Sequence, residues 1–225
     1  MYTEICILYK YFVGNAYKLD LFWWVMEKIG DYWKKSVAFL KKDSWPSFAV
    51  TLILAFVIIK FIFFPGLSLI TGTSLPLVIV ESCSMYHSEG LEEVLDNNVY
   101  DKWGIDLASA VNWDFKRGMS KGDVIFVVGT KNIEVGDVII FTSRGSSQPY
   151  PIIHRVVTAG DTYSTKGDHN TAQLTASNNR HKTDETNISE DEIIGKALFK
   201  VPFVGWAKLI FFEGKQPSDN KGLCQ

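Results

Sequence analysis

The sequence has few cysteines, and their placement argues against a disulfide-built scaffold. The chain holds three of them, Cys6, Cys83 and Cys224, an odd number at wide spacing. Small disulfide-stabilised domains carry an even number of cysteines, and structural zinc sites need paired ligands such as Cys-x-x-Cys. The sequence therefore predicts neither a disulfide framework nor a cysteine-based metal site.

Other signatures of common binding proteins and enzymes are absent as well. The net charge is -2 at pH 7, so the chain lacks the basic excess that is typical of nucleic-acid-binding domains. It has no glycine-rich phosphate loop and no His-Glu-x-x-His motif, and its four histidines are scattered. We therefore expect no cofactor, no metal and no nucleic-acid partner.

What the sequence does contain is a long apolar run. Residues 47–64 read SFAVTLILAFVIIKFIFF, with Lys60 as the one charge, close to the end. About 20 residues of helix span the hydrocarbon core of a bilayer, and a lysine near the helix end can reach the headgroups. The pattern predicts a transmembrane helix over 47–64 that stops at Pro65 and Gly66. A buried core helix is the alternative, and the long region 1–46 argues against a cleaved signal peptide.

The charges around this run predict its orientation. Lysines are frequent before it, whereas after Lys60 the next basic residue is Lys102. Basic residues favour the cytoplasmic side of a membrane. We therefore expect a single-pass protein of the cell membrane or the endoplasmic-reticulum membrane, with a cytoplasmic N-terminus and residues from 66 onward outside. The lysines before the run are Lys28, Lys34, Lys35, Lys41 and Lys42.

Residues 1–46 are predicted to contain an amphipathic helix on the cytoplasmic side. Apolar side chains recur at helical spacing, with lysines between them and with Trp23 and Trp24 close by. Such a helix can lie in the membrane surface or pack on a partner protein. The regularly spaced apolar residues are Phe22, Val25, Ile29, Trp33, Val37 and Leu40.

The rest of the chain is rich in short β-forming runs, separated by Gly, Asn, Asp, Ser and Pro. This spacing predicts a mainly β domain of partly closed antiparallel sheets over 65–212. Residues 86–118 are expected to form an insertion with some helix, 171–187 an exposed loop, and 213–225 a C-terminal tail. The triplet Asn-Ile-Ser at Asn187 is a glycosylation sequon on the expected outer side.

Three residues of this domain are candidates for nucleophilic chemistry. Ser84 follows a β-forming run, and a serine there becomes a nucleophile only with a base and with donors for the oxyanion. His154 lies in PIIHRVV, a strand-like setting that holds an imidazole rigidly, and Asp168 lies in the turn-like TKGDHN. Taken singly, each also fits an ordinary role: a polar turn, a core histidine and an Asx turn.

Several blocks of the chain resemble type I signal peptidases of the archaeal and endoplasmic-reticulum type. In chain order they are SCSMYH, KGDVIFV, VGDVIIF, PIIHRVV, TKGDHN and IIGKALFKVPFVGW, within residues 70–212. The resemblance implies a membrane-bound serine endopeptidase that cleaves signal peptides of preproteins after small residues. It also implies Ser84 as nucleophile, His154 as general base and Asp168 as orienting acid, with the lipid bilayer and accessory subunits as further partners.

The chain departs from the family pattern at two places that bear on the site. Cys83 stands where the family has a glycine between two serines. Leu174 stands where the family usually carries a second aspartate, so the orienting acid is left to Asp168, with Asp161 and Asp184 as alternatives. Asp168→Asn is accordingly expected to lower turnover much more than Asp161→Asn.

An extended signal peptide can add to a sheet edge through backbone hydrogen bonds. We expect the runs 74–81 and 121–128 to flank such a groove, with shallow apolar pockets for small side chains. The hydroxyl of Ser82 and the backbone N–H of Ser84 are expected to hold the oxyanion. The residues expected to line the groove are Val78, Val80, Met85 and Phe126.

Three other interpretations stay open at this point. Bacterial signal peptidases use a lysine base, and Lys131 and Lys166 are the lysines available for that role. A second interpretation is a non-catalytic, membrane-anchored β module that binds extended peptides. A third is a metal site with Cys83 and His87, although their spacing lacks a second pair of ligands.

Overall fold

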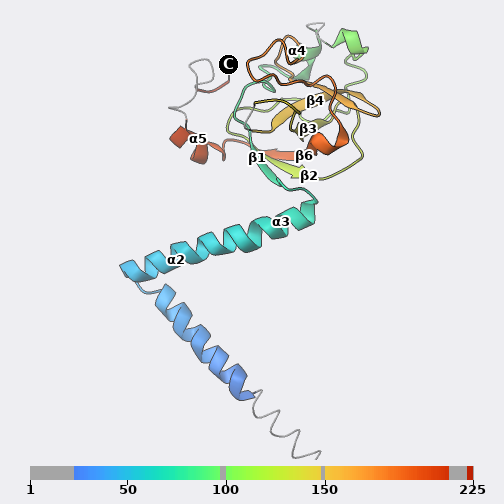
Figure 1. The fold of residues 1–225 in the computed structure, drawn as a ribbon. Coiled ribbons are helices and arrows are strands. Elements are labelled where there is room, and N and C mark those ends of the chain that lie inside the picture. Colours follow the sequence, from blue (N-terminus) through green and yellow to red (C-terminus); the bar gives the residue numbers. More distant parts are fainter. Residues whose placement is uncertain (1–22, 97–99, 148–149, 213–221, 225) are drawn as a thin grey trace, which may run out of the picture. The chain divides into compact units, whose positions relative to one another are not determined.

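The computed structural model describes residues 23–96, 100–147, 150–212 and 222–224. Cys6, Phe22 and most of the tail 213–225 lie outside the described residues. The chain divides into two compact units, Met1–Phe63 and Phe64–Gln225. Within the described residues the first unit is helical, and the second holds the strands (Figure 1).

The described residues of the N-terminal unit include two helices joined by a tight turn. Residues 23–40 are helical, and α2 (Trp45–Ile58) follows. Ser47 is buried and donates from Oγ to the carbonyl oxygen of Leu40 at 2.9 Å. This hydrogen bond ties the start of α2 to the end of the helix before it.

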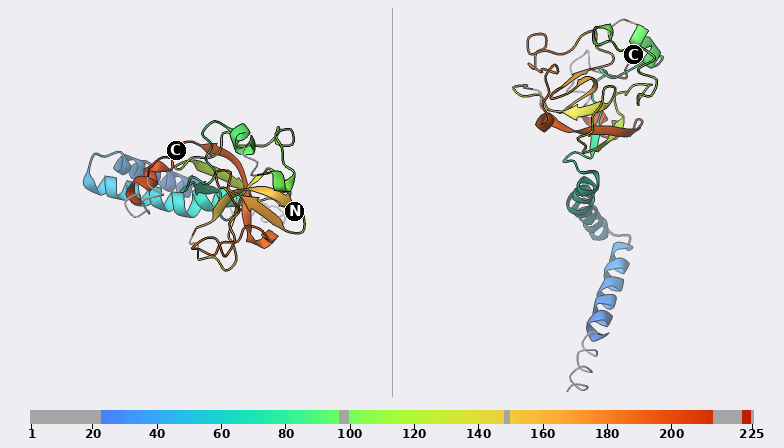
Figure 2. Two further views of the ribbon diagram at one scale, coloured as in Figure 1. Left: turned by 90° about the horizontal axis from the view of Figure 1, so that it is seen from above. Right: turned by 90° about the vertical axis from the view of Figure 1, so that its right-hand side faces the viewer.

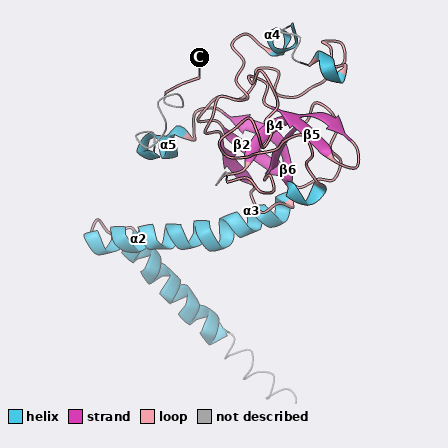
Figure 3. Ribbon diagram, turned by 45° about the horizontal axis from the view of Figure 1, so that its top comes forward, coloured by secondary structure: helices cyan, strands magenta, loops and turns pink. Residues whose placement is uncertain are grey.

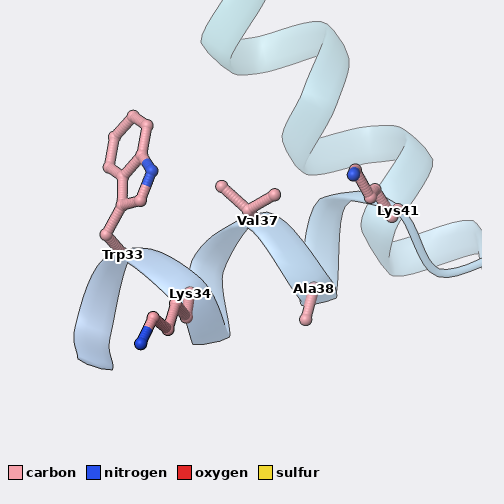
Figure 4. A pocket seen from close by; sticks show the side chains of 5 residues that line it. All are labelled: Trp33, Lys34, Val37, Ala38 and Lys41. Atoms are coloured by element: carbon pink, nitrogen blue, oxygen red, sulfur yellow. The ribbon is translucent and has the colours of Figure 1, made fainter. Parts of the chain in front are cut away.

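The helix over 23–40 leaves its apolar residues uncovered within this unit. The side chain of Ile29 is 55% exposed and that of Trp33 is 71% exposed. A shallow pocket on this helix is shown in Figure 4, lined by Trp33, Lys34, Val37, Ala38 and Lys41. Tryptophan, valine and lysine on one exposed helix are the combination expected of a segment that contacts a membrane surface.

The chain has one described helix long and apolar enough to cross a membrane, and it extends past the predicted end. This helix covers Trp45–Thr71, 27 residues. Pro65 does not end it, because a π-helical turn, Ile59–Phe63, comes first and α3 (Phe64–Thr71) begins just before the proline. Proline is accepted in the first turn of a helical segment, where its missing N–H leaves no partner unpaired. The helix ends instead at Gly72, whose φ of 68° suits glycine.

The second unit is built on a six-stranded antiparallel sheet with the order β1-β2-β6-β3-β4-β5. This confirms the predicted mainly β, antiparallel domain. The strands gather in one body, coloured magenta in Figure 3 and seen from two further sides in Figure 2. They are β1 (Leu77–Ile79), β2 (Val124–Val128), β3 (Val138–Phe141), β4 (Ile152–Ala159), β5 (Tyr163–Lys166) and β6 (Ile193–Val201).

Two apolar clusters lie on opposite faces of this sheet. Side chains alternate between the faces along each strand, so neighbouring residues pack into different clusters. In β3, for example, Ile140 belongs to the first cluster and Ile139 to the second. The first cluster also holds Met85, Ile125, Val127 and Val138, and the second holds Phe141, Val156 and Ile188.

The insertion 86–118 contains helix, as predicted, and has a small core of its own. It forms α4 (Leu91–Asp96) and the 3-10 turn η2 (Asp101–Trp103). Tyr100 is fully buried in a cluster that also includes Val157 of β4. The insertion is therefore packed onto the sheet.

Two further segments complete the domain. The loop 171–187 has no helix or strand, as predicted, but it is not wholly exposed, since Thr183 and Glu185 are 2% and 0% exposed. After η3 (Glu190–Glu192) and β6 comes α5 (Trp206–Phe212). The indole N–H of Trp206 donates to the carbonyl oxygen of Lys121 at 3.0 Å, which holds α5 against the start of β2.

Candidate active site

Ser84 lies just after β1, a strand at the edge of the sheet. Pairing continues one residue beyond the strand, because Val80 N–H donates to Asp123 O and Gly122 N–H donates to Val80 O, both at 2.9 Å. The chain then turns away from β2. The position of Ser84 is thus set by a strand that stops a few residues before it.

The hydroxyl of Ser84 has a second serine beside it. Ser84 is half-buried, and its Oγ lies 3.2 Å from Oγ of the exposed Ser82. Either oxygen can donate in this hydrogen bond. The predicted helper residue is therefore within reach of the candidate nucleophile.

Met85 anchors the turn in the core. Its side chain is 1% exposed, and its Sδ accepts the backbone N–H of Asp168 at 3.5 Å. Its carbonyl oxygen accepts the N–H of Met119 at 2.7 Å. The structure therefore places Met85 in the first apolar cluster and away from the substrate-binding surface that the sequence predicts for it.

His154 lies in β4, as predicted, with a rigidly held ring. It pairs with Ile139 of β3 and is 3% exposed. Its Nδ1 is hydrogen-bonded to a carboxylate oxygen of Glu185. A carboxylate accepts, so Nδ1 carries the proton, and in the neutral ring Nε2 keeps its lone pair.

Gly167 joins Ser84 to His154. A methyl group at Gly167 would lie 2.8 Å from His154 Nε2 and 2.9 Å from the carbonyl oxygen of Ser84. The same carbonyl accepts the N–H of His169 at 2.8 Å, so the serine turn is fastened to the Gly167 turn. No direct hydrogen bond between Ser84 Oγ and His154 is present among the described residues. Catalytic hydrogen bonds often tighten only when substrate binds.

Asp168 does not lie beside His154. It is 4% exposed, and its carboxylate accepts three hydrogen bonds from Arg155, the closest at 2.7 Å. It also accepts one from Tyr100 at 2.6 Å and pairs with His87 at 2.8 Å. Burial by itself would raise the pKa of Asp168, but Arg155 and the hydrogen bond from His87 outweigh it and hold that pKa well below its usual range.

Asp168 contacts Arg155 and not His154 because the side chains of β4 alternate between the two faces of the sheet. His154 pairs with Ile139, which faces the second apolar cluster, and Arg155 pairs with Val138, which faces the first. Adjacent strand residues point to opposite faces. Asp168 lies on the Arg155 side, so the orienting role predicted for it is corrected.

Glu185, which the sequence reasoning missed, takes the place next to His154. Its carboxylate contacts Nδ1 of His154 and accepts from Thr165 Oγ1 at 3.0 Å and from Leu174 N–H at 2.7 Å. The neighbouring Asp184 was an alternative acid, and its carboxylate instead caps Thr186 in the same loop. An acidic pair in a polar loop carries no local sign that one member is buried.

The lysines considered as alternative bases point elsewhere. Burial lowers the pKa of Lys166 to about 8, which suits a base, but its Nζ donates to the carbonyl oxygens of Gly167 and Asp168 at 2.8 and 3.3 Å. Lys131 is exposed and forms an ion pair with Glu190 at 3.1 Å. Neither ammonium is directed at Ser84.

Cys83 and Cys224 form a disulfide, which the sequence reasoning did not expect. They are 141 residues apart in the chain, a separation at which sequence alone does not indicate a pair. The two residues considered as metal ligands both have other partners. Cys83 is in the disulfide, and His87 contacts Asp168 and the carbonyl oxygen of Lys116. Among the described residues no group of three or more His, Cys, Asp or Glu side chains is placed to hold a metal ion.

The predicted groove residues are divided between two faces. β1 pairs directly with β2, so no groove runs between them. Val78 pairs with Ile125 and packs with the buried Val80 on the first cluster. Phe126 lies on the other face, where its ring stacks on Phe199 at 4.2 Å, so it cannot share a pocket with Val78.

Comparison with known proteins gives relatives that are catalytic subunits of the signal peptidase complex. No family model matches the chain. The chain is 28% identical over 166 residues to the signal peptidase complex catalytic subunit SEC11 of Komagataella phaffii, which covers 69% of this chain and 77% of that protein. It is 27% identical over 180 residues to the subunit of the same name from Pyricularia oryzae, covering 75% and 84%. The Fusarium vanettenii subunit is 27% identical over 175 residues, covering 74% and 78%.

Proposed function

We propose that this chain, a relative of the type I signal peptidases of the endoplasmic-reticulum type, is a membrane-bound serine endopeptidase that removes signal peptides from preproteins. The observation that carries the proposal is that the backbone oxygen of Ser84 and Nε2 of His154 both lie close to Gly167. A strand-end serine and an imidazole with a lone pair on Nε2 are the two groups that acyl transfer needs.

In this proposal Ser84 Oγ attacks the carbonyl carbon of the scissile bond while His154 Nε2 takes its proton. The imidazolium then donates that proton to the leaving amine, and the signal peptide stays on Ser84 as an ester. Water, deprotonated by His154, attacks the ester and releases the serine. The Ser82 hydroxyl, 3.2 Å from Ser84 Oγ, and the backbone N–H of Ser84 are the proposed oxyanion donors.

The proposed substrate segment is an extended peptide with small side chains near the cut. β1 is at the edge of the sheet, so its second side can accept a peptide strand through backbone hydrogen bonds. Val78 is half-buried beside that edge, and it stays a proposed contact. The names of the relatives speak of a complex, and accessory subunits are proposed for this chain on that ground.

The catalytic domain is proposed to lie outside the cytoplasm. Disulfides form and persist in oxidising compartments, and both Cys83 and Cys224 belong to the unit Phe64–Gln225. The lysines before the membrane helix favour the cytoplasmic side for the other end. The exposed apolar residues of the helix 23–40 are proposed to rest on the cytoplasmic membrane surface.

The test is cleavage of a preprotein by the purified full chain in detergent or lipid. Ser84→Ala is expected to abolish processing, because it removes the hydroxyl that is proposed to attack the scissile bond. Ser88→Ala, an exposed serine close in sequence, serves as the matched control and is expected to process normally. Full cleavage by Ser84→Ala would contradict the role of Ser84 as nucleophile. No cleavage by the natural chain, with peptide binding intact in Ser84→Ala, would favour the alternative, a non-catalytic β module that binds extended peptides.

The choice of base is tested in the same assay. His154→Ala is expected to lower turnover at least as much as any other single change apart from Ser84→Ala. Lys166→Met can lower stability, because its Nζ donates to two buried backbone carbonyls, but turnover per folded molecule should be kept. The reverse pattern would indicate a Ser/Lys mechanism.

A further inference from the structure

Glu185 is a carboxylate buried where a surface loop would ordinarily expose it. It lies in the segment 171–187, which has no helix or strand, yet it is 0% exposed. Burying an ionised carboxylate is costly unless hydrogen bonds compensate. A carboxylate that is kept in such a place is therefore tied to specific partners.

Each carboxylate oxygen of Glu185 has a separate set of partners. Oε2 contacts His154 Nδ1 and accepts from Thr165 Oγ1 at 3.0 Å. Oε1 accepts the backbone N–H of Leu174 at 2.7 Å. Thr165 and Leu174 thus fix the plane of the carboxylate, and Oε2 is left in contact with the imidazole of His154.

The backbone of Glu185 is fixed by the same two neighbours. Thr165 N–H donates to Glu185 O at 2.9 Å, and Glu185 N–H donates to Leu174 O at 3.1 Å. Thr165 belongs to β5, an ordered strand next to β4. The loop therefore holds Glu185 against the strand pair that carries His154.

Leu174 is the position at which the family resemblance leads one to expect a second aspartate. Here its side chain is apolar, but its backbone accepts from and donates to Glu185. A glutamate farther along the chain therefore brings a carboxylate to the neighbourhood of residue 174. His154 therefore has an acidic partner although residue 174 is a leucine and not an aspartate.

We infer that Glu185 is the positioning residue of the catalytic site, which holds His154 with its proton on Nδ1 and stabilises the imidazolium during proton transfer. The inference rests on the proposed function and adds to it the acid that Asp168 does not supply. Asp168 in turn keeps the insertion on the sheet. A carboxylate on Nδ1 is what gives a neutral histidine the tautomer that can act as base.

The first test is Glu185→Gln in the full chain, assayed by preprotein cleavage. The amide N–H of glutamine donates to Nδ1, which selects the tautomer with the proton on Nε2 and removes the base. We expect kcat to fall by about 100-fold or more while KM changes little, in line with the effect of a wrong tautomer in serine proteases. Asp161→Asn, an exposed acid in the β4–β5 turn, is the matched control and should keep full turnover.

The pH–rate profile separates positioning from a structural role. Loss of the negative charge makes the imidazolium harder to form, so the acidic limb of kcat/KM should move to lower pH in Glu185→Gln. A purely structural defect would lower the whole profile without moving the limb. Turnover of Glu185→Gln within twofold of the natural protein, or an unmoved limb, would overturn the inference.

A relocated carboxylate gives a second test that does not depend on Glu185→Gln being well folded. Leu174→Asp is combined with Glu185→Ala. Residues 174 and 185 are hydrogen-bonded neighbours, so the double variant moves the carboxylate from position 185 to position 174. Turnover well above that of Glu185→Ala alone supports the inference, and equal turnover of two folded variants contradicts it.

Ser84→Ala and His154→Ala are assayed in parallel. If these two variants also cleave the preprotein, the proposed function itself is wrong. If they lose cleavage while the Glu185 variants keep it, only the role of Glu185 is wrong.

Discussion

At Gly167, the backbone comes between the two candidate catalytic residues. The nearest atoms to an added methyl group would be Asn170 Nδ2 at 2.6 Å, His154 Nε2 at 2.8 Å and Ser84 O at 2.9 Å. Real Cβ atoms are not found so close to other heavy atoms, and packed interiors do not yield without a shift. Glycine is needed here for close approach, since it lets the serine turn and the histidine ring share one contact point.

Gly167→Ala is therefore expected to disturb the site more than the fold. The methyl group must displace the imidazole or the Ser84 carbonyl, so we expect turnover to fall by about 100-fold, the scale at which a displacement near 1 Å acts. Overpacking should cost about 1–3 kcal/mol of unfolding free energy. Cleavage kinetics and thermal unfolding measure the two effects.

Gly160→Ala is the matched control for this change. Nothing lies within 4 Å of a methyl group at Gly160, which is in the exposed turn after β4. Both turnover and unfolding temperature should stay close to those of the natural protein. Normal turnover in Gly167→Ala would mean that Ser84 and His154 do not work through this junction.

At the scale of the element, β4 carries two adjacent residues with different tasks. His154 contacts Glu185, and Arg155 contacts Asp168. Arg155 is 0% exposed and also donates to the carbonyl oxygens of Gly136, at 2.8 Å, and of Asp114, at 3.0 Å. The ion pair thus links β4 to the insertion 86–118, while the neighbouring His154 contacts Glu185.

Asp168→Asn is expected to act mainly through stability. It leaves Arg155 as a buried cation without its partner, and breaking a buried pair costs about 3–5 kcal/mol. Turnover should fall more than in Asp161→Asn, as the sequence already predicts, but in step with the folded fraction. Thermal unfolding and turnover per folded molecule distinguish this from a direct catalytic role. A large loss of turnover in fully folded Asp168→Asn would contradict it.

The ion pair of Asp168 and Arg155 makes the unfolding free energy fall as the pH is lowered. The folded-state pKa of Asp168 lies below its unfolded value of about 3.9. The stability that the ionised form contributes is therefore present above about pH 4 and is lost as pH falls toward the folded pKa. Unfolding free energy should decline below about pH 4 in the natural protein, with a weaker decline in Asp168→Asn.

At the scale of the whole molecule, the Cys83–Cys224 disulfide closes the longest loop in the described chain. It connects the turn that carries Ser84 to the end of the chain, 141 residues later. The backbone N–H of Lys121 also donates to Cys224 Sγ, at 3.4 Å. Residues 222–224 are thereby placed next to the candidate nucleophile's turn.

Loss of this disulfide should lower stability. A cross-link over so long a loop restricts the unfolded chain, and its removal costs about 2–5 kcal/mol. Cys224→Ser, Cys83→Ser and the double variant should lose the same amount, because each removes one and the same bond. Thermal unfolding of the three variants, with and without reductant, gives the measurement. Losses that add in the double variant would show that the two cysteines are not paired.

Prediction from the sequence succeeded where the signal lies in a short stretch of chain. The apolar run revealed a helix long and apolar enough to cross a membrane, and the β-forming runs revealed the antiparallel domain. The blocks around Ser84 and His154 pointed to two residues that both lie against Gly167. The predicted end of the apolar helix was wrong, since the helix continues through Pro65 to Thr71. These features depend on periodicity and local propensity, which neighbouring residues determine.

The identity of the acid beside His154, the task of Asp168 and the pairing of Cys83 were decided only by the tertiary structure. Each depends on which face of a strand a residue takes and on which distant segment lies against it. Side-chain alternation in β4 separates His154 from Asp168, although a triad pattern in the sequence puts them together. A loop without regular structure supplies Glu185, and the chain end supplies Cys224. Composition and spacing along the chain do not encode these contacts, because they join segments that only folding brings together.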